Sequence, residues 1–336
     1  LRRGPPSPVN YTNAATRIYS PSLRAWSALL ERGSRVYTGL RYSIYRSLPV
    51  RLQNIAVSAI ASVRWRHESS PAFRKLVIKL QKMQYWPLDD IEEYRRGRLA
   101  EVLLAARNTP YYKDMIPDEE VVRKDPAGVL KSLPVLDKQT IARDPGVFIP
   151  VNVDPGRMVR RGTSGTTGSP LRVYWTREST DWERAMVWRH RLAAECRFGL
   201  HWVGMVGGHR IVPIEQRNPP FWRECPPARL TFLSTYHLSS ENALHYHRYM
   251  SERGIAFLSG YPSALYALAL SFRKHGLSLP LKGAFFGSEP LHSFQREAIE
   301  SVFDCYVWDY YGLTERVVSA GEFECRNGLH VNWENS

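Results

Sequence analysis

Short apolar runs alternate with longer helix-like segments in the last third of the chain. Residues 255–260 (IAFLSG), 281–287 (LKGAFFG) and 305–312 (CYVWDYYG) have the length and composition of strands. Residues 262–276 and 288–303, which separate these runs, carry apolar side chains at helical spacing. Strands that alternate with helices of this length predict an α/β fold with a parallel-rich sheet and crossover helices.

Helical spacing also dominates the earlier part of the chain. In residues 89–112 acidic side chains gather in the first turn and Pro110 follows the end, as is typical of helix boundaries. Another helix is expected from Thr180, where Glu183 gives the spacing of a capping box, and Gly199 is its expected terminator.

A third helical pattern, at residues 48–66, places an apolar stripe beside basic side chains. The stripe consists of Leu52, Ile55, Ala56, Ala59, Ile60 and Val63, and it is flanked by Arg51, Arg64 and Arg66. A helix that lies in a membrane interface has this pattern. A helix that docks its stripe on its own domain has the same pattern and is more common, so docking is the favoured interpretation.

Length and composition favour a globular protein with at least one sizeable core. The chain has 336 residues, of which 43% are hydrophobic, and it contains no uncharged apolar run of the roughly 18 residues that a membrane span needs. The first residues lack the apolar region of a secretory signal. The four cysteines lie far apart without a C-x-x-C pair, which is typical of reduced thiols, so we expect a cytoplasmic protein.

The formal net charge of +14 is concentrated in the N-terminal third. Residues 1–107 hold 19 Lys and Arg against 7 Asp and Glu, whereas the remaining residues hold 27 against 25. No helix-turn-helix, zinc-finger or RNP-like pattern accompanies the basic residues, so no nucleic-acid partner is expected. Two interpretations stay open: peripheral contact with an anionic membrane through residues 1–107, and ordinary solvation of helix faces, which is more common.

One stretch, RRGTSGTTGSPLRVYWT at residues 160–176, is rich in glycine and hydroxyl side chains. Gly162, Gly165 and Gly168 allow consecutive backbone amides to face an anion. Hydroxyl donors come from Thr163, Ser164, Thr166 and Thr167. The stretch is not a Walker A loop, because no Lys-Ser/Thr pair follows the last glycine. It suits a phosphate chain, although a polar surface loop has a similar composition.

Residues 287–291 (GSEPL) follow one predicted strand and open a predicted helix. Ser288 is a candidate N-cap of that helix, and Pro290 suits its first turn. Ligands collect at the carboxyl ends of parallel strands, which is where this turn is expected.

Residues 309–315 (DYYGLTE) follow the next predicted strand and offer three kinds of ligand contact. Tyr311 has an aromatic face for a base, Thr314 has a hydroxyl for a phosphate, and Glu315 has a hard oxygen ligand for Mg²⁺. Each residue alone would also fit an ordinary turn.

Together and in this order, the three motifs resemble those of the adenylate-forming superfamily: acyl-CoA synthetases, non-ribosomal peptide adenylation domains and luciferases. TSGTTGSP is similar to its phosphate loop, GSEPL to its adenine-side turn and YYGLTE to its Y-G-x-T-E motif. LLAARNTPYYKD, LPVLDK and DYYGLTERVVSAGE resemble the phenylacetate–CoA ligase branch. LPVRLQNIAVS and SGYPSALYALA resemble the CapK-like proteins of that branch, which are often associated with surface polysaccharide synthesis.

The resemblance, which covers roughly residues 37–334, implies an AMP-forming acid–thiol ligase. In this family a carboxylate attacks the α-phosphate of ATP, which gives an acyl-adenylate and pyrophosphate. CoA or another acceptor then takes the acyl group. The implied ligands are therefore a small carboxylic acid, ATP, Mg²⁺ and CoA, and the protein contributes mainly positioning and charge neutralisation.

The resemblance also implies a role for each motif. The β- and γ-phosphates would be held by Ser164, Gly165, Thr166, Thr167 and Gly168. The adenine would be bordered by Gly287, Ser288, Glu289 and Pro290. The nucleotide site would continue along Asp309, Tyr310, Tyr311, Gly312 and Thr314, with Tyr311 stacked on the base and Thr314 at the α-phosphate. Thr166, Thr314 and Glu315 would be catalytic, and Glu315 would bind Mg²⁺.

The sequence departs from the family pattern in two places. Leu171 and Arg172 stand where many members have a Lys after the phosphate loop. The family continues into a hinge and a small C-terminal lid with a catalytic Lys, whereas this sequence stops at GLHVNWENS, so a truncated form without the lid is expected. The expected organisation is a disordered basic tail at 1–35, a helical part of the large domain at 36–150 and the ATP/AMP-binding core at 151–336.

Other functions stay open at this point. A non-catalytic nucleotide-binding or scaffold protein would keep the motifs without turnover, and in a basic nucleic-acid or membrane-surface binder the ATP motifs would be incidental. Aromatic candidates for an acyl pocket are Trp202, Tyr236, His237 and Tyr261. Cys325 and His330 could form half of a zinc site, but the sequence shows no second pair.

Overall fold

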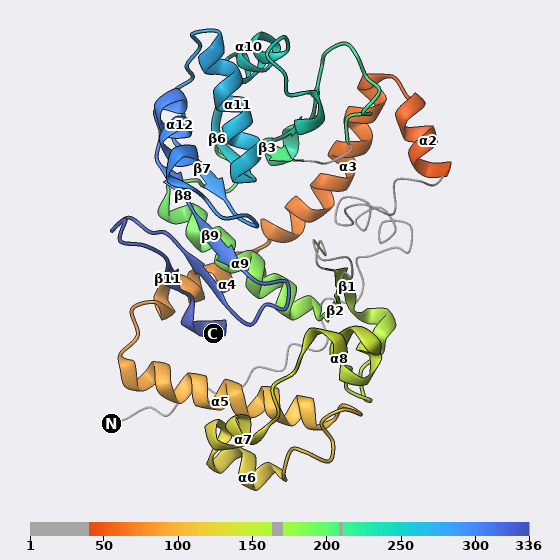
Figure 1. The fold of residues 1–336 in the computed structure, drawn as a ribbon, viewed down its shortest axis with the longest axis vertical. Helices are drawn as coiled ribbons and strands as arrows, with labels where there is room; N and C mark the ends of the chain where they lie inside the picture. Colours follow the sequence, from red (N-terminus) through yellow and green to blue (C-terminus); the bar gives the residue numbers. More distant parts are fainter. Residues whose placement is uncertain (1–39, 163–170, 208–210, 336) are drawn as a thin grey trace.

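The structure, a computed structural model, describes residues 40–162, 171–207 and 211–335. Figure 1 shows an upper part that contains a sheet covered by helices and a lower part that is mostly helical. The long helix α9 (Arg177–Ala193) crosses the middle of the molecule between these parts (Figure 1). Among the described residues, no helix has the length and apolar character needed to cross a membrane.

The N-terminal part of the described chain is helical. Its helices are α2 (Leu40–Ser47), α3 (Val50–Glu68), α4 (Pro71–Met83), α5 (Leu88–Arg107), α6 (Glu119–Lys124), α7 (Pro126–Ser132) and α8 (Lys138–Arg143). Side-chain caps begin several of them; Asp118, for example, accepts a hydrogen bond from the Val121 N–H at 3.1 Å. The helix predicted at 89–112 is confirmed as α5, which ends before Pro110.

Helix α3 confirms the helix predicted at 48–66, but its apolar stripe is not the face that docks. The buried residues of α3 are Gln53, Val57, Ala61 and Glu68. Leu52 and Ile55 of the predicted stripe are exposed. The buried face is partly polar because it meets a buried cation: Gln53 Oε1 accepts a hydrogen bond from Arg223 Nε at 2.9 Å. Docking was therefore predicted correctly and its face was not.

Six strands form the main sheet in the order β4-β5-β3-β6-β7-β8. They are β3 (Trp202–Gly207), β4 (Trp222–Cys225), β5 (Leu230–Ser234), β6 (Ile255–Gly260), β7 (Gly283–Phe286) and β8 (Val307–Trp308). Edge strand β4 is antiparallel to β5, and every other pair of neighbours is parallel. The predicted α/β fold with a parallel-rich sheet is confirmed.

Both faces of this sheet are covered. Helices α10 (Ala243–Arg253), α11 (Pro262–Lys274) and α12 (Ser293–Phe303) pack on one face, where Leu258 and Phe286 enter the core. Phe257 and Phe285, their neighbours in sequence, point to the other face and pack with Cys196, just after α9. Crossover helices explain why these strands are apolar at successive positions.

Three helix boundaries differ from the prediction. Helix α9 begins at Arg177 with Thr176 as its N-cap, whereas the Thr180 hydroxyl only donates to the Thr176 carbonyl at 3.0 Å. Helix α9 also ends at Ala193, before Gly199. Helix α12 begins at Ser293 with His292 as its N-cap, so Ser288 is not a cap and Pro290 is not in a first turn.

Two small antiparallel sheets complete the fold. Strands β1 (Val159–Gly162) and β2 (Arg172–Trp175) form a hairpin on either side of residues 163–170. Strands β9 (Tyr310–Gly312), β10 (Ser319–Gly321) and β11 (His330–Val331) form the second sheet. The predicted strand at 305–312 is therefore divided, because Asp309 separates β8 in the main sheet from β9 in the small one.

Candidate active site

The predicted phosphate loop lies outside the described residues, and with it Ser164, Gly165, Thr166, Thr167 and Gly168. The hairpin that flanks it is described and contacts the last motif. Trp175 Nε1, in β2, donates a hydrogen bond to the Thr314 carbonyl at 2.8 Å. The Arg316 guanidinium lies 3.5 Å from the centre of the Trp175 ring. The hairpin and the Y-G-x-T-E segment are therefore neighbours in space.

The 287–290 turn lies against β9. A Cβ at position 287 would come within 3.2 Å of the Tyr310 carbonyl oxygen, so glycine permits this close approach. Ser288 has a φ of 71°, a left-handed conformation that is strained for a non-glycine residue. Glu289 Oε2 accepts hydrogen bonds from the Ser263 hydroxyl at 2.6 Å and the Ser263 N–H at 3.3 Å, which ties the turn to the start of α11.

The 309–315 segment is fixed by hydrogen bonds at its first residue, and residues near its other end are exposed to solvent. The Asp309 N–H donates to Glu322 Oε2 at 2.9 Å, and Glu322 forms an ion pair with Arg296 at 2.7 Å. Burial raises the pKa of Asp309. Tyr311 and Glu315 are exposed, and Glu315 has no hydrogen bond or ion pair within the described parts of the chain. An exposed, unengaged carboxylate next to the phosphate-loop hairpin fits a Mg²⁺ ligand.

A pocket of ≈ 240 Å³ opens beside these two motifs. Its wall and floor come from α9 and from the carboxyl ends of β3, β6 and β7, and Tyr261, Ser288 and Tyr310 border it. The strands approach closely here, since a Cβ at position 260 would lie 2.1 Å from the Val206 carbonyl oxygen. A larger hollow of ≈ 480 Å³ over α3 and β4 touches none of the motifs. The smaller pocket is therefore the candidate acid site.

Two basic residues of α9 line this pocket. His190 is buried, and its Nε2 has no hydrogen-bond partner in the described residues. Burial lowers the pKa of His190 to about 4, so its ring is neutral near pH 7. Arg191 donates from a terminal nitrogen to the Ser259 hydroxyl at 3.3 Å. Burial also lowers the pKa of the Arg191 guanidinium.

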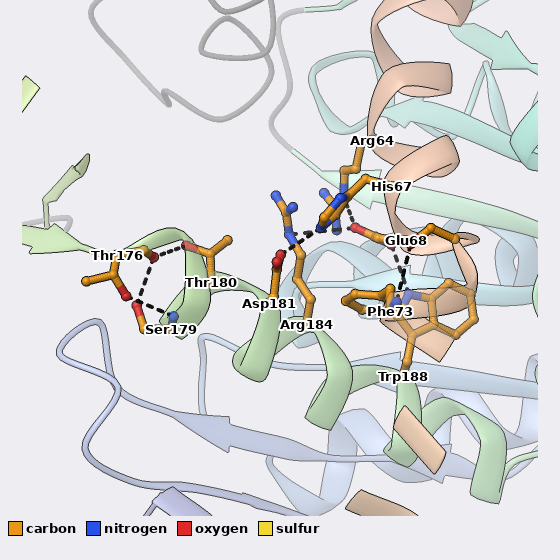
Figure 2. Close-up of polar contacts among 11 residues, drawn as sticks. Arg64, His67, Glu68, Phe73, Thr176, Ser179, Thr180, Asp181, Arg184 and Trp188 are labelled. Atoms are coloured by element: carbon orange, nitrogen blue, oxygen red, sulfur yellow. Dashed lines mark hydrogen bonds and ion pairs between the residues drawn. The ribbon is translucent and has the colours of Figure 1, made fainter. Parts of the chain in front are cut away.

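Helix α9 is fixed to α3 by a charged cluster (Figure 2). His67 Nε2 and Asp181 Oδ1 are 2.9 Å apart, and the hydrogen bond to Asp181 raises the pKa of His67. Glu68 accepts from Arg64 Nε at 2.5 Å and from Trp188 Nε1 at 2.9 Å. Burial alone would raise the pKa of Glu68, but Arg64 and the neighbouring Arg184 lower it to about 2. This cluster holds α9 in place and thereby positions the pocket wall.

Sequence reasoning found some of the pocket and missed its α9 wall. Of the aromatic candidates, Tyr261 borders the pocket. Trp202 instead packs under Arg253, with 3.8 Å from the guanidinium to the ring centre, and the His237 ring bonds to the Ser234 hydroxyl at 2.8 Å. One sequence feature could have indicated the α9 wall: residues 188–191 (WRHR) place a run of basic residues inside an otherwise amphipathic helix.

The described residues offer Cys325 and His330 no further zinc ligand. Cys325 Sγ and His330 Nε2 do lie 2.8 Å apart, at the exposed edge of the small sheet. Across the described ranges, however, no group of three or more His, Cys, Asp or Glu is arranged to hold a metal ion. The pair therefore stays a single contact in a turn.

No family model matches the chain. It is 24% identical over 311 residues to Protein CapK of Staphylococcus aureus, and the match covers 86% of this chain and 66% of CapK. The solved structure of 2-hydroxyisobutyryl-CoA ligase in the postadenylation state, in complex with R3-HIB-AMP, has a TM-score of 0.50 and 20% identity.

That match covers 74% of this chain and 54% of the ligase, so the chain spans about half of the ligase and about two thirds of CapK. The same ligase with 2-HIB-AMP and CoA in the thioesterification state has a TM-score of 0.48 and 20% identity. The chain therefore shares the fold of this ligase over the matched part and is similar in sequence to CapK, which agrees with the resemblance of its motifs.

Proposed function

We propose that this chain contains the ATP- and acid-binding part of an AMP-forming acid–thiol ligase. It would convert a small carboxylic acid and ATP to an acyl-adenylate and pyrophosphate, before transfer of the acyl group to CoA or another acceptor. One observation carries the proposal: the phosphate-loop hairpin, the 287–290 turn, the 309–315 segment and the pocket adjoin one another around α9 and the ends of the parallel strands. The ligase of similar fold has been solved with an acyl-AMP, which supports this reading.

Each group then has a task that its surroundings allow. The acid would enter the pocket, with its reacting carboxylate toward Tyr310 and the turn at Ser288. The exposed ring of Tyr311 would stack on adenine, and Thr314 and Thr166 would contact the phosphates. Glu315 would hold Mg²⁺, which would supply positive charge to the phosphates. The described residues would mainly orient the acid and exclude water.

The finer parts of the proposal follow from the resemblance. We propose residues 36–150 as the helical part of the large domain and 151–336 as its nucleotide-binding core. The similarity to CapK supports an acceptor in surface polysaccharide synthesis. ATP and CoA as substrates fit a cytoplasmic location.

The test is a calorimetric comparison of Glu315→Gln with the parent and with Glu297→Gln, a matched change at an exposed site on α12. Glu315→Gln should weaken Mg²⁺-dependent ATP binding by about 10-fold or more, because one charged ligand is lost, and should hardly change Mg²⁺-free AMP binding. Equal losses for both nucleotides would remove Glu315 from the metal site.

Pyrophosphate exchange separates catalysis from binding alone. Acid-dependent ATP–pyrophosphate exchange across a panel of small acids would support the ligase. Nucleotide binding without exchange would favour a non-catalytic nucleotide-binding protein. A chain that binds neither ATP nor AMP would refute the proposal.

A further inference from the structure

Arg191 is a cation whose local partners are incomplete. Its Nε is buried without a hydrogen-bond partner. One of its terminal nitrogens donates to the Ser259 hydroxyl at 3.3 Å. Its guanidinium carbon lies 5.3 Å from the centre of the Trp188 ring and 5.7 Å from that of Phe285, so aromatic faces surround much of the charge. Within the described residues no carboxylate is at ion-pair distance from it. A desolvated guanidinium with so few acceptors is costly.

Two fully buried arginines of this molecule, Arg189 and Arg223, have more acceptors than the half-buried Arg191, although Arg189 Nε is also buried without a partner. Arg189, two positions earlier on α9, bonds to the Glu334 carboxylate, to Asn332 Oδ1 at 2.5 Å and to the Leu80 carbonyl at 2.9 Å. Arg223 bonds to two backbone carbonyls and to two glutamine side chains. Arg191 therefore differs from these two arginines in its small number of acceptors, and not in having an unpartnered Nε.

That place is the pocket. Arg191, Ser259 and His190 all line it, on the side formed by α9 and β6. Ser288 and Tyr310, which belong to the nucleotide motifs, also border the pocket, and the Tyr310 ring centre lies 5.4 Å from that of His190. The unpartnered Nε2 of the neutral, buried His190 adds a second polar group with unused hydrogen-bonding capacity. A ligand in the pocket would present one end to the nucleotide motifs and the other to Arg191 and Ser259.

We propose that the acid bound here carries a second anionic group, as a short dicarboxylate does, and that Arg191 and Ser259 bind this second group. The inference rests on the proposed function only for naming the pocket as the acid site. A guanidinium and a carboxylate form charge-assisted hydrogen bonds in the geometry that both planes prefer. The small volume, ≈ 240 Å³, suits a compact acid. A purely aliphatic acid would leave the Arg191 charge desolvated and unpaired.

The test measures acid binding to the purified chain by calorimetry, without nucleotide. Malonate is compared with isovalerate and succinate with isocaproate, since each second acid replaces one carboxylate by a branched methyl pair of similar shape. The better dicarboxylate should bind about 10-fold or more tightly than its isostere. Equal binding of the two members of each pair would overturn the proposal, as would no detectable dicarboxylate binding at millimolar concentration.

Two substitutions locate the preference at Arg191. Arg191→Met should abolish the preference for the dicarboxylate over its isostere, and Arg191→Lys should retain part of this preference. The control Arg248→Met, at an exposed site on α10, should leave the preference unchanged. Because no carboxylate of the described residues is at ion-pair distance from Arg191, Arg191→Met should melt at or above the temperature of the parent. A dicarboxylate preference that survives in Arg191→Met would also overturn the proposal.

ATP binding, measured separately, distinguishes this inference from the proposed function. Normal ATP binding with no dicarboxylate preference would refute only the second anionic group. A dicarboxylate preference in a chain that binds no nucleotide would refute the ligase and leave the anion site.

Discussion

Two charged groups at α9, Glu68 and Arg191, differ in how completely they are paired. On the side of α3, Glu68 is surrounded by Arg64, Arg184 and the Trp188 indole, and its carboxylate is fully engaged (Figure 2). On the side of the pocket, Arg191 has one hydroxyl acceptor. Paired charges hold a helix to its neighbour, whereas a charge that lacks a partner costs stability unless a ligand supplies one. The paired cluster around Glu68 therefore supports the fold, whereas Arg191 is the charge that the proposed ligand would pair.

The largest expected effect comes from the paired arginine next to the unpaired one. Arg189→Met would leave the Glu334 carboxylate buried and uncompensated, which should lower the free energy of unfolding by about 3–5 kcal/mol. Urea unfolding measures this loss. Arg191→Met, the same substitution two positions away, is the matched control and should cause no loss. The double variant Arg189→Met/Glu334→Gln should recover part of the stability, and a double variant no more stable than Arg189→Met would contradict this explanation.

A second prediction concerns acid. The pKa of Glu68 is about 2 in the folded state against 4.5 when unperturbed, so the unfolded chain binds the proton more readily. The stabilisation by this carboxylate is present above pH 4.5 and is lost as the pH falls toward 2, with a total of about 3 kcal/mol. Unfolding free energies measured between these pH values should show the loss in the parent. Glu68→Gln should be less stable at neutral pH and should lack this part of the acid dependence.

Much of the fold could be predicted from local pattern. Residues 255–260 were predicted as a strand and form β6 with the same bounds, because glycine and charged residues delimit an apolar run. The docking face of α3 could not be predicted, since it depends on Arg223, which lies 170 positions from Gln53. The strand at 305–312 was overextended because Asp309, which divides it, is held by Glu322 from a later segment.

The motif residues of the candidate site were named from the sequence, whereas the pocket residues that depend on helix packing were missed. The motif resemblance named Ser288 and Glu289 for the nucleotide, and the structure adds what a sequence does not show: the left-handed φ of Ser288 and the bonds from Ser263 to Glu289. His190 and Arg191 were missed because helical spacing alone did not show that one face of α9 meets the pocket. Whether a charged side chain has a partner depends on contacts between residues far apart in the sequence, so it could not be predicted from local spacing.

A smaller effect is expected for Trp188→Phe, which tests whether the Glu68 cluster and Arg191 act independently, since the Trp188 ring contacts both. The substitution removes the 2.9 Å hydrogen bond to Glu68 and some buried volume, and it should lower the free energy of unfolding by about 2 kcal/mol. The stacked contact of ring 188 with Phe198 can be kept by phenylalanine. The ratio of dicarboxylate to isostere affinity should change by less than about 3-fold, which is within about 0.6 kcal/mol. A large change in that ratio would show that the Glu68 cluster and Arg191 are coupled.

The smallest effect should come from the half-exposed pair of His67 and Asp181 at the rim of the same cluster. The hydrogen bond to Asp181 raises the pKa of His67 above 6.5, so the folded state binds the proton more tightly than the unfolded chain. Its stabilisation is fully present below pH 6.5 and is lost as the pH rises through the folded-state pKa. Because solvent screens both side chains, the effect should be only a few tenths of a kcal/mol. Urea unfolding at pH values on either side of neutrality should show this slope in the parent and not in His67→Gln. An identical slope in His67→Gln would mean that His67 does not titrate differently in the folded chain, and that the firm attachment of α9 to α3 depends on Glu68 alone.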